Sequence, residues 1–215
     1  MKATFPEIYR RLLEYYGPQH WWPAKDAFEM MLGAILIQHT AWPNASRAIE
    51  KLRDAGLLAP EPLHRTTLDR LGNLIRSAGV YKVKAQRIQA FLSWYRSNGE
   101  LRSLGALSTV ELRRALLSVN GIGPETADNI LVYAFERPVF VVDAYSRQLF
   151  RRYNLANGDE KYSQLQAAVE SALPRDAVIL GELHALIVEH GKQACRRKPL
   201  CEECRLRTTC ARVLN

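Results

Sequence analysis

The four cysteines of this 215-residue chain all lie near its C-terminal end, with the spacing C-x5-C-x2-C-x5-C. They are Cys195, Cys201, Cys204 and Cys210. Reduced thiols at such short spacing are typical metal ligands, so the quartet predicts a metal site rather than a disulfide framework. Four thiolates suit either zinc or an iron–sulfur cluster, and the spacing alone leaves that choice open. The first loop between them holds Arg196, Arg197 and Lys198, which form either a phosphate-binding surface or a solvated basic turn.

A second candidate site is the turn Gly121-Ile122-Gly123, which precedes Pro124. Two glycines around one apolar residue permit backbone angles that a side chain would block, and Pro124 suits the first turn of a helix. Main-chain N–H groups converging on that helix N-terminus would bind an anion such as a DNA phosphate. The same turn would also serve simply to connect two packed helices.

Asp143 follows the apolar run Val139–Val142 and precedes an amphipathic segment. A carboxylate at a helix N-terminus stays ionised near neutral pH, and it can stabilise a cationic sugar or orient an attacking water. Asp is also among the preferred helix N-cap residues, so capping alone would explain it. The sequence leaves both roles open.

Three of the four tryptophans lie close to the two ends of one apolar segment. The residues concerned are Trp21, Trp22 and Pro23 before that segment, and Gln38, His39 and Trp42 after it. Tryptophans beside a helix are also common in hydrophobic cores. A turn hydrogen bond alone would explain His39.

The elements that position these residues follow the helical period throughout, apart from one expected strand at Val139–Val142. Ser108 and Glu111 form a capping-box pattern that opens a helix to about residue 118, and Asn120-Gly121 marks its end. The other predicted helices cover residues 6–16, 27–38, 44–54, 67–77, 82–97, 124–135, 144–153, 162–173 and 176–190. The sequence therefore predicts an all-α fold.

The composition fits a globular protein, with 47% hydrophobic and 24% charged residues. A net charge of +8 favours an anionic partner, of which nucleic acid is the commonest. The longest apolar run, 28–37, is too short to span a bilayer, and the N-terminal residues do not have the pattern of a signal peptide. We therefore expect no membrane association and a cytoplasmic, nucleoid-associated protein.

The glycine turn, Asp143 and the cysteine quartet, taken in this order, resemble the endonuclease III superfamily of DNA glycosylases over most of the chain. The resemblance implies a six-helix barrel domain at 27–136 with a helix-hairpin-helix motif, beside a cluster-bearing helical domain formed by 1–26 and 137–215. It implies a 4Fe-4S cluster rather than zinc on the cysteines, double-stranded DNA with a damaged base as partner, and a monomer. Asp143 matches the catalytic aspartate, and the hairpin residues that hold phosphate match Gly121, Ile122, Gly123 and Thr126.

Two departures from the family pattern matter. Bifunctional members carry a lysine nucleophile at the position of Glu125, and a carboxylate cannot form a Schiff base with the sugar. The first two cysteines are separated by five residues, where relatives usually have six. The first departure predicts a monofunctional glycosylase, which releases a base with water and leaves an abasic site.

The Trp-Trp-Pro segment and Trp42 are similar to those of the endonuclease III-like 3-methyladenine DNA glycosylases. Base excision requires a pocket with planar walls for the extruded base, and a cationic alkylated purine is attracted to electron-rich ring faces. The resemblance also implies that His39 stands where relatives have the residue that fills the gap left by the flipped base. We therefore predict excision of alkylated purines from duplex DNA. The alternatives are removal of mismatched adenine or of uracil or thymine, a bifunctional glycosylase and lyase, and a non-enzymatic iron–sulfur protein that binds DNA or senses redox state.

Overall fold

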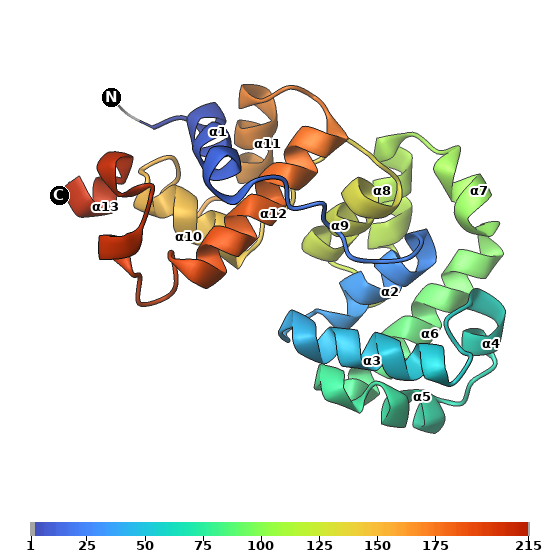
Figure 1. The fold of residues 1–215 in the computed structure, drawn as a ribbon. Helices are drawn as coiled ribbons and strands as arrows, with labels where there is room; N and C mark the ends of the chain where they lie inside the picture. The colour runs from blue at the N-terminus through green and yellow to red at the C-terminus, as the bar shows by residue number, and fades with distance from the viewer. Residues whose placement is uncertain (1–2, 215) are drawn as a thin grey trace. The chain divides into compact units, whose positions relative to one another are not determined.

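The computed structural model describes residues 3–214, and every regular element in that range is helical (Figure 1). The α-helices are α1 (Phe5–Tyr16), α2 (Ala27–Leu36), α3 (Trp42–Asp54), α4 (Pro60–His64), α5 (Leu68–Leu74), α6 (Tyr81–Ser97), α7 (Glu100–Gly105), α8 (Thr109–Leu117), α9 (Pro124–Ala134), α10 (Ala144–Arg152), α11 (Tyr162–Ala172), α12 (Ala177–Gln193) and α13 (Ala211–Leu214). Short 3-10 turns follow α5 and α12: η1 (Arg76–Ala78), η2 (Cys201–Glu203) and η3 (Arg207–Thr209). The all-α prediction is confirmed.

The chain forms two compact units. The central unit consists of residues 22–135, from the start of the α2 region to the end of α9. The terminal unit combines the residues up to 21 with those from 136 onward. Within the terminal unit, Arg11 of α1 donates hydrogen bonds to the hydroxyls of Thr208 and Thr209, so the two ends of the chain are joined directly.

In the central unit, α2 is the core helix. Every residue from Phe28 to Leu36 is buried, because α2 packs against α9, α3 and α6. Asp26 caps its N-terminus by accepting a hydrogen bond from the Glu29 amide at 2.9 Å. A helix that is apolar on nearly all sides must be surrounded by others, which explains why its sequence shows little amphipathic pattern.

Lys84 of α6 is fully buried beneath this core. Its Nζ donates to the carbonyl oxygens of Leu36 at 2.8 Å and Ala78 at 2.6 Å, tying the ends of α2 and η1 to α6. Burial, with a smaller contribution from the charge of Arg87, lowers the pKa of Lys84 from 10.5 to about 8.

In the terminal unit, α12 packs against α1 and α10. Phe140, Val142 and Phe150 share its hydrophobic core with Leu12 and Leu183. Figure 1 shows α12 as the long helix of this unit, with α1 beside it.

The expected strand at Val139–Val142 is wrong. The segment is extended but has no strand partner among the described residues, and side chains of α11 take the place of one. Glu170 accepts the Phe140 amide at 2.8 Å, Gln166 donates to the Phe140 carbonyl at 2.8 Å, and the Tyr162 hydroxyl accepts the Val142 amide at 3.2 Å. Buried backbone groups must be paired, and long polar side chains pair them here.

Three short helices, α4, α7 and α13, were not predicted, because four to six residues carry too little periodicity to detect. The predicted helix at 67–77 is divided into α5 and η1. No helix among residues 3–214 is long and apolar enough to cross a membrane.

Replacing Lys84 with Met tests the pKa shift through stability. Between pH 8 and 10.5 the folded protein releases a proton that the unfolded chain still holds, so the free energy of unfolding of the wild type should rise with pH. Lys84→Met lacks this term. The wild-type minus variant difference, measured by urea denaturation, should therefore grow between pH 7.5 and 9.5. A constant or falling difference would contradict the assignment.

Candidate functional site

Asp143 is the N-cap of α10, as predicted. Its Oδ1 accepts the Ser146 amide at 2.7 Å, while the Ser146 hydroxyl accepts the Asp143 amide at 2.9 Å. This reciprocal capping box fixes the carboxylate at the positive end of the helix. Both residues are buried.

The second carboxylate oxygen of Asp143 faces His184, a buried residue of α12. His184 Nε2 lies 3.5 Å from Asp143 Oδ2. Burial acts to raise the pKa of Asp143, but the hydrogen bond and charge of His184, together with the Ser146 amide, outweigh it. The pKa of Asp143 therefore lies below its ordinary value of 3.8, and the carboxylate is ionised at neutral pH.

Trp21 covers one face of the His184 ring. The two rings are stacked, with centroids 5.5 Å apart and planes inclined by 15°. Lys192 Nζ lies 5.5 Å from the Trp21 ring centroid, so the indole interacts with a cation of α12 as well. Asp143, His184 and Trp21 thus form one cluster within the terminal unit.

The hairpin turn belongs to the central unit, between α8 and α9. Gly121 has φ +88°, and a Cβ there would lie 2.3 Å from Arg87 Cγ, so both backbone angle and space require glycine. Gln38 Nε2 donates to the Gly121 carbonyl and to the Thr126 hydroxyl, each at 2.9 Å. Arg87 in turn donates to Gln38 Oε1. Gln38 is therefore a clamp on the hairpin, and its predicted place in the base pocket stays a prediction.

The two helices of the hairpin are joined by an ion pair. Arg113 of α8 donates from Nε and Nη2 to the two carboxylate oxygens of Asp128 of α9, at 2.7 and 3.0 Å. Asp128 is fully buried, so this bidentate pair fixes how α8 and α9 meet. Gly123 caps α9 through its backbone, Ile122 is buried beneath the turn, and Glu125 lies exposed in the first turn of α9.

Trp22 and Trp42 meet edge to face in the central unit, with ring centroids 5.3 Å apart. Trp22 also packs on Tyr133, and Gly33 of α2 leaves room for its indole nitrogen. Trp42 and Pro23 line a cavity of about 320 Å³, whose wall includes the ion pair of Glu29 with Arg53 at 2.8 Å. A cavity of this size, with one tryptophan in its wall, is large enough for a base.

His39 is exposed and has a left-handed backbone with φ +53°. Its ring makes no hydrogen bond with the described part of the chain. A non-glycine residue in this conformation carries strain, which often marks functional positions.

The four cysteines line one small cavity in the terminal unit, together with Tyr153 and His190. All four are free thiols. Arg152 of α10 donates to Cys195 Sγ at 2.9 Å, and His190 Nε2 lies 3.8 Å from Cys204 Sγ. Burial raises the pKa of Cys195 and Cys204.

As placed, no three His, Cys, Asp or Glu side chains within residues 3–214 approach closely enough to hold a metal ion. The donor set nevertheless fits a four-thiolate group, because the thiols share one cavity and a guanidinium already donates to one sulfur. Arg196, Arg197 and Lys198 in the first loop are exposed. Arg196 bonds back to the Lys192 carbonyl at 2.8 Å.

Comparison with known proteins places these features in a family. A family model described as HhH-GPD superfamily base excision DNA repair protein matches residues 32–175. Because this match covers more than half of the chain, the protein belongs to that superfamily, and the resemblance to endonuclease III is confirmed. It is therefore a base excision repair glycosylase by family.

The chain is also similar to individual DNA repair proteins. The chain is 44% identical over 207 residues to a Methanocaldococcus jannaschii protein named "Putative DNA repair glycosylase MJ1434", covering 95% of this chain and 94% of that protein. It is 27% identical over 205 residues to endonuclease III of Thermotoga maritima, covering 95% and 91%.

Solved structures include the 3-methyladenine DNA glycosylase MagIII of H. pylori bound to 1,N6-ethenoadenine. That match has a TM-score of 0.75 and 27% identity, and covers 88% of this chain and 97% of that one. A non-covalent endonuclease III–DNA complex matches with a TM-score of 0.84 over 99% of this chain and 97% of that one, at 20% identity, and supports the fold.

His184, Arg87 and Asp128 were missed by sequence reasoning. Each is a polar residue on a helix, and the residue that it contacts lies far along the chain. No local motif therefore indicates its role. The one available signal was His184 itself, a histidine within the apolar run of α12.

Substituting His184 tests how Asp143 is kept ionised. His184→Phe removes the hydrogen bond and the charge while keeping a ring against Trp21, so the pKa of Asp143 should rise. His184→Gln keeps a donor without charge and should give a smaller rise. Carboxyl carbon NMR titration measures both. An unchanged Asp143 titration in His184→Phe would show that His184 does not control it.

Proposed function

We propose that this protein is a monofunctional DNA glycosylase that hydrolyses the N-glycosidic bond of alkylated purines in duplex DNA. The observation that carries the proposal is the buried, ionised Asp143 at the N-terminus of α10. An aspartate that only caps a helix needs no further polar partner, whereas Asp143 also contacts the His184 ring. The family assignment supports glycosylase chemistry independently.

In the proposed reaction the bond between the sugar C1′ and the base nitrogen breaks, and its electron pair leaves with the base. The Asp143 carboxylate stabilises the positive charge that develops on the sugar. Water then adds to C1′ and transfers a proton to that carboxylate. A cationic alkylated purine leaves without prior protonation, which suits a site with one clear carboxylate.

The central unit has the complementary role of holding DNA. We infer that main-chain N–H groups at the N-terminus of α9 bind a phosphate, with Gly121, Ile122, Gly123 and Thr126 forming the hairpin. The clamp by Gln38 and the Arg113–Asp128 pair would keep this turn rigid. We assign the predicted barrel domain to the central unit and the predicted cluster domain to the terminal unit, and Arg196, Arg197 and Lys198 to phosphate contact.

The preference for alkylated purines rests on the aromatic residues and on MagIII, whose structure contains 1,N6-ethenoadenine. Pro23 and Trp42 line the cavity described above, Trp22 packs against Trp42, and Trp21 belongs to the Asp143 cluster. Electron-rich rings attract a cationic base by about 2 kcal/mol when desolvated. His39, exposed and strained, is proposed to fill the gap that the extruded nucleotide leaves.

The absence of lyase activity is proposed from Glu125. A carboxylate at this position supplies no amine for a Schiff base. The abasic site should therefore leave the enzyme with its strand intact.

The test uses single-turnover release of bases from duplexes that each carry one lesion: 3-methyladenine, mismatched uracil, or adenine opposite oxidised guanine. Asp143→Asn should slow release of 3-methyladenine by at least ~100-fold, because the charge that stabilises the sugar is lost. The matched control is Asp176→Asn, which removes the other N-cap aspartate of the terminal unit, at α12.

Strand breaks should appear only after alkali treatment, and borohydride should trap no enzyme–DNA adduct. Wild-type release rates in Asp143→Asn, with DNA binding unchanged, would support a non-enzymatic DNA-binding protein instead. Faster release of uracil or adenine than of 3-methyladenine would reject the proposed substrate class.

We further propose a 4Fe-4S cluster on Cys195, Cys201, Cys204 and Cys210. Bound there, the group would cross-link the C-terminal turns and rigidify the basic loop. Arg152 would donate to the sulfur of Cys195, and His190 and Tyr153 would shield the site.

Anaerobically purified protein should be brown, with about four iron atoms per chain, and chelation of the metal should lower its melting temperature. Cys204→Ser should reduce the iron content. The control is Ser171→Ala, an exposed residue of α11 outside the cavity. A colourless protein containing zinc would overturn the assignment.

A further inference from the structure

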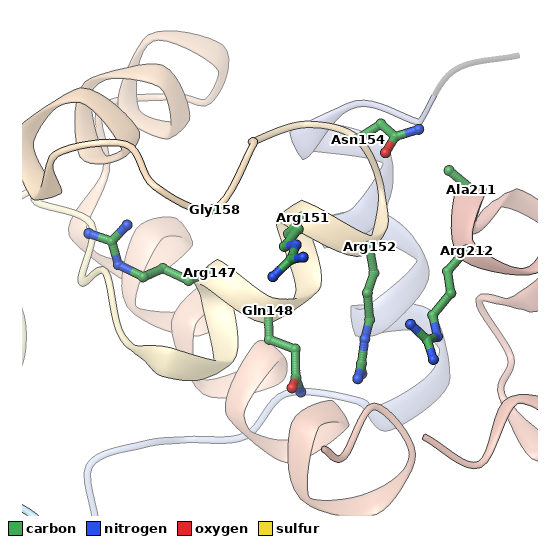
Figure 2. A pocket seen from close by; sticks show the side chains of 8 residues that line it. All are labelled: Arg147, Gln148, Arg151, Arg152, Asn154, Gly158, Ala211 and Arg212. Atoms are coloured by element: carbon green, nitrogen blue, oxygen red, sulfur yellow. The ribbon is translucent and has the colours of Figure 1, made fainter. Parts of the chain in front are cut away.

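The terminal unit contains a second cavity, of about 430 Å³, that the proposed reaction does not use. It lies along α10 and extends to the loop after that helix and to α13. Figure 2 shows the eight residues that line it: Arg147, Gln148, Arg151, Arg152, Asn154, Gly158, Ala211 and Arg212. Four of them are arginines, and no acidic side chain is among these lining residues.

Neutral acceptors hold two of the arginines in place. Arg147 Nη1 donates to the Glu160 carbonyl oxygen at 2.9 Å. Arg152 donates to the carbonyl oxygens of Cys195 at 3.0 Å and Arg197 at 3.3 Å, and to Cys195 Sγ at 2.9 Å. Carbonyl groups orient a guanidinium but do not neutralise it, so the acceptor of Arg147 leaves its charge in place, whereas the Cys195 sulfur would partly compensate Arg152 when it is a thiolate.

None of the four arginines forms an ion pair with a carboxylate in the described part of the chain. Glu160 is close enough to Arg147 for the two charges to interact, but it does not line the cavity. Its carboxylate instead accepts the backbone N–H groups of Asn157 and Gly158. The cavity therefore combines four positive charges with amide groups from Gln148 and Asn154.

Gly158 provides the space in which Arg151 lies. It has φ +100°, and a Cβ on it would stand 2.9 Å from Arg151 Cδ. Arg147 and Arg151 are four residues apart on α10, so they point to the same side of the helix. In Figure 2, Arg152 of α10 and Arg212 of α13 extend in the same direction.

We propose that this cavity is a binding site for phosphate groups. Planar guanidinium groups bind phosphate oxygens in bidentate fashion, and several arginines without carboxylate ion-pair partners, lining one concave surface, attract a polyanion rather than a single carboxylate. The phosphates come either from a DNA strand that contacts the terminal unit or from a free polyphosphate. The inference does not depend on the proposed glycosylase activity, because it needs no base release.

The first measurement is calorimetric titration with inorganic tripolyphosphate at low salt. Arg147→Gln with Arg151→Gln should weaken binding at least tenfold. The matched control is Arg10→Gln with Arg175→Gln, which removes two exposed positive charges of the same unit outside the cavity and should bind within about twofold of the wild type. Arg147→Lys with Arg151→Lys keeps the charge but loses the bidentate geometry, and should fall between them. Melting temperatures verify that each variant is folded.

The second measurement is the salt dependence of binding to an undamaged 24-base-pair duplex. If the strand occupies the cavity, the slope of log K against log salt should fall by about two in the Gln double variant and not in its control. Selective loss of tripolyphosphate binding with an unchanged slope would identify a free polyphosphate as the ligand. If the two double variants behave alike in both measurements, the proposal is wrong. Asp143→Asn should bind tripolyphosphate like the wild type, which separates this site from the catalytic one.

Discussion

The terminal unit must keep the Asp143 carboxylate ionised although this carboxylate is buried. Burial opposes the charge, so the carboxylate requires donors: the Ser146 amide at the start of α10 and the His184 ring from α12. These donors come from two helices that pack on each other. The position of the carboxylate thus depends on the helix packing, and the stacking of Trp21 on His184 extends that dependence to the N-terminal segment.

Much of the fold was predictable because its helix boundaries are encoded locally. Asp26, Ser108 and Asp143 each cap a helix that begins at the next residue. The segment around Phe140 was misread because β-branched and apolar residues look alike in a strand and in an extended segment paired by side chains. Its partners are Gln166 and Glu170 of α11, more than twenty residues away, so only the tertiary structure decides between the two.

The candidate site was predictable at positions where the backbone angle and the available space admit only one residue type. Gly121 is an example, since its positive φ and the close approach of Arg87 both demand glycine. The partners of such residues were not predictable. Gln38 was predicted to belong to a base pocket, which stays a prediction, but no local pattern indicated that its amide N–H groups donate to the hairpin. A polar side chain has several chemically equivalent uses, and its neighbours in space select one of them.

The three irregular segments of the candidate site are stabilised in the same way. The hairpin turn, the extended segment before Asp143 and the turn after Cys195 are irregular, so their backbone groups lack helical partners. Long side chains from neighbouring helices supply them: Gln38 for the hairpin, Gln166 for the extended segment, and Arg152 for the Cys195 turn. Irregular backbone is where phosphates, bases and metals are approached, and it stays rigid only if such groups are paired. At Arg152 this side-chain pairing has a second effect, because the guanidinium that pairs the backbone also places a positive charge at the cavity wall.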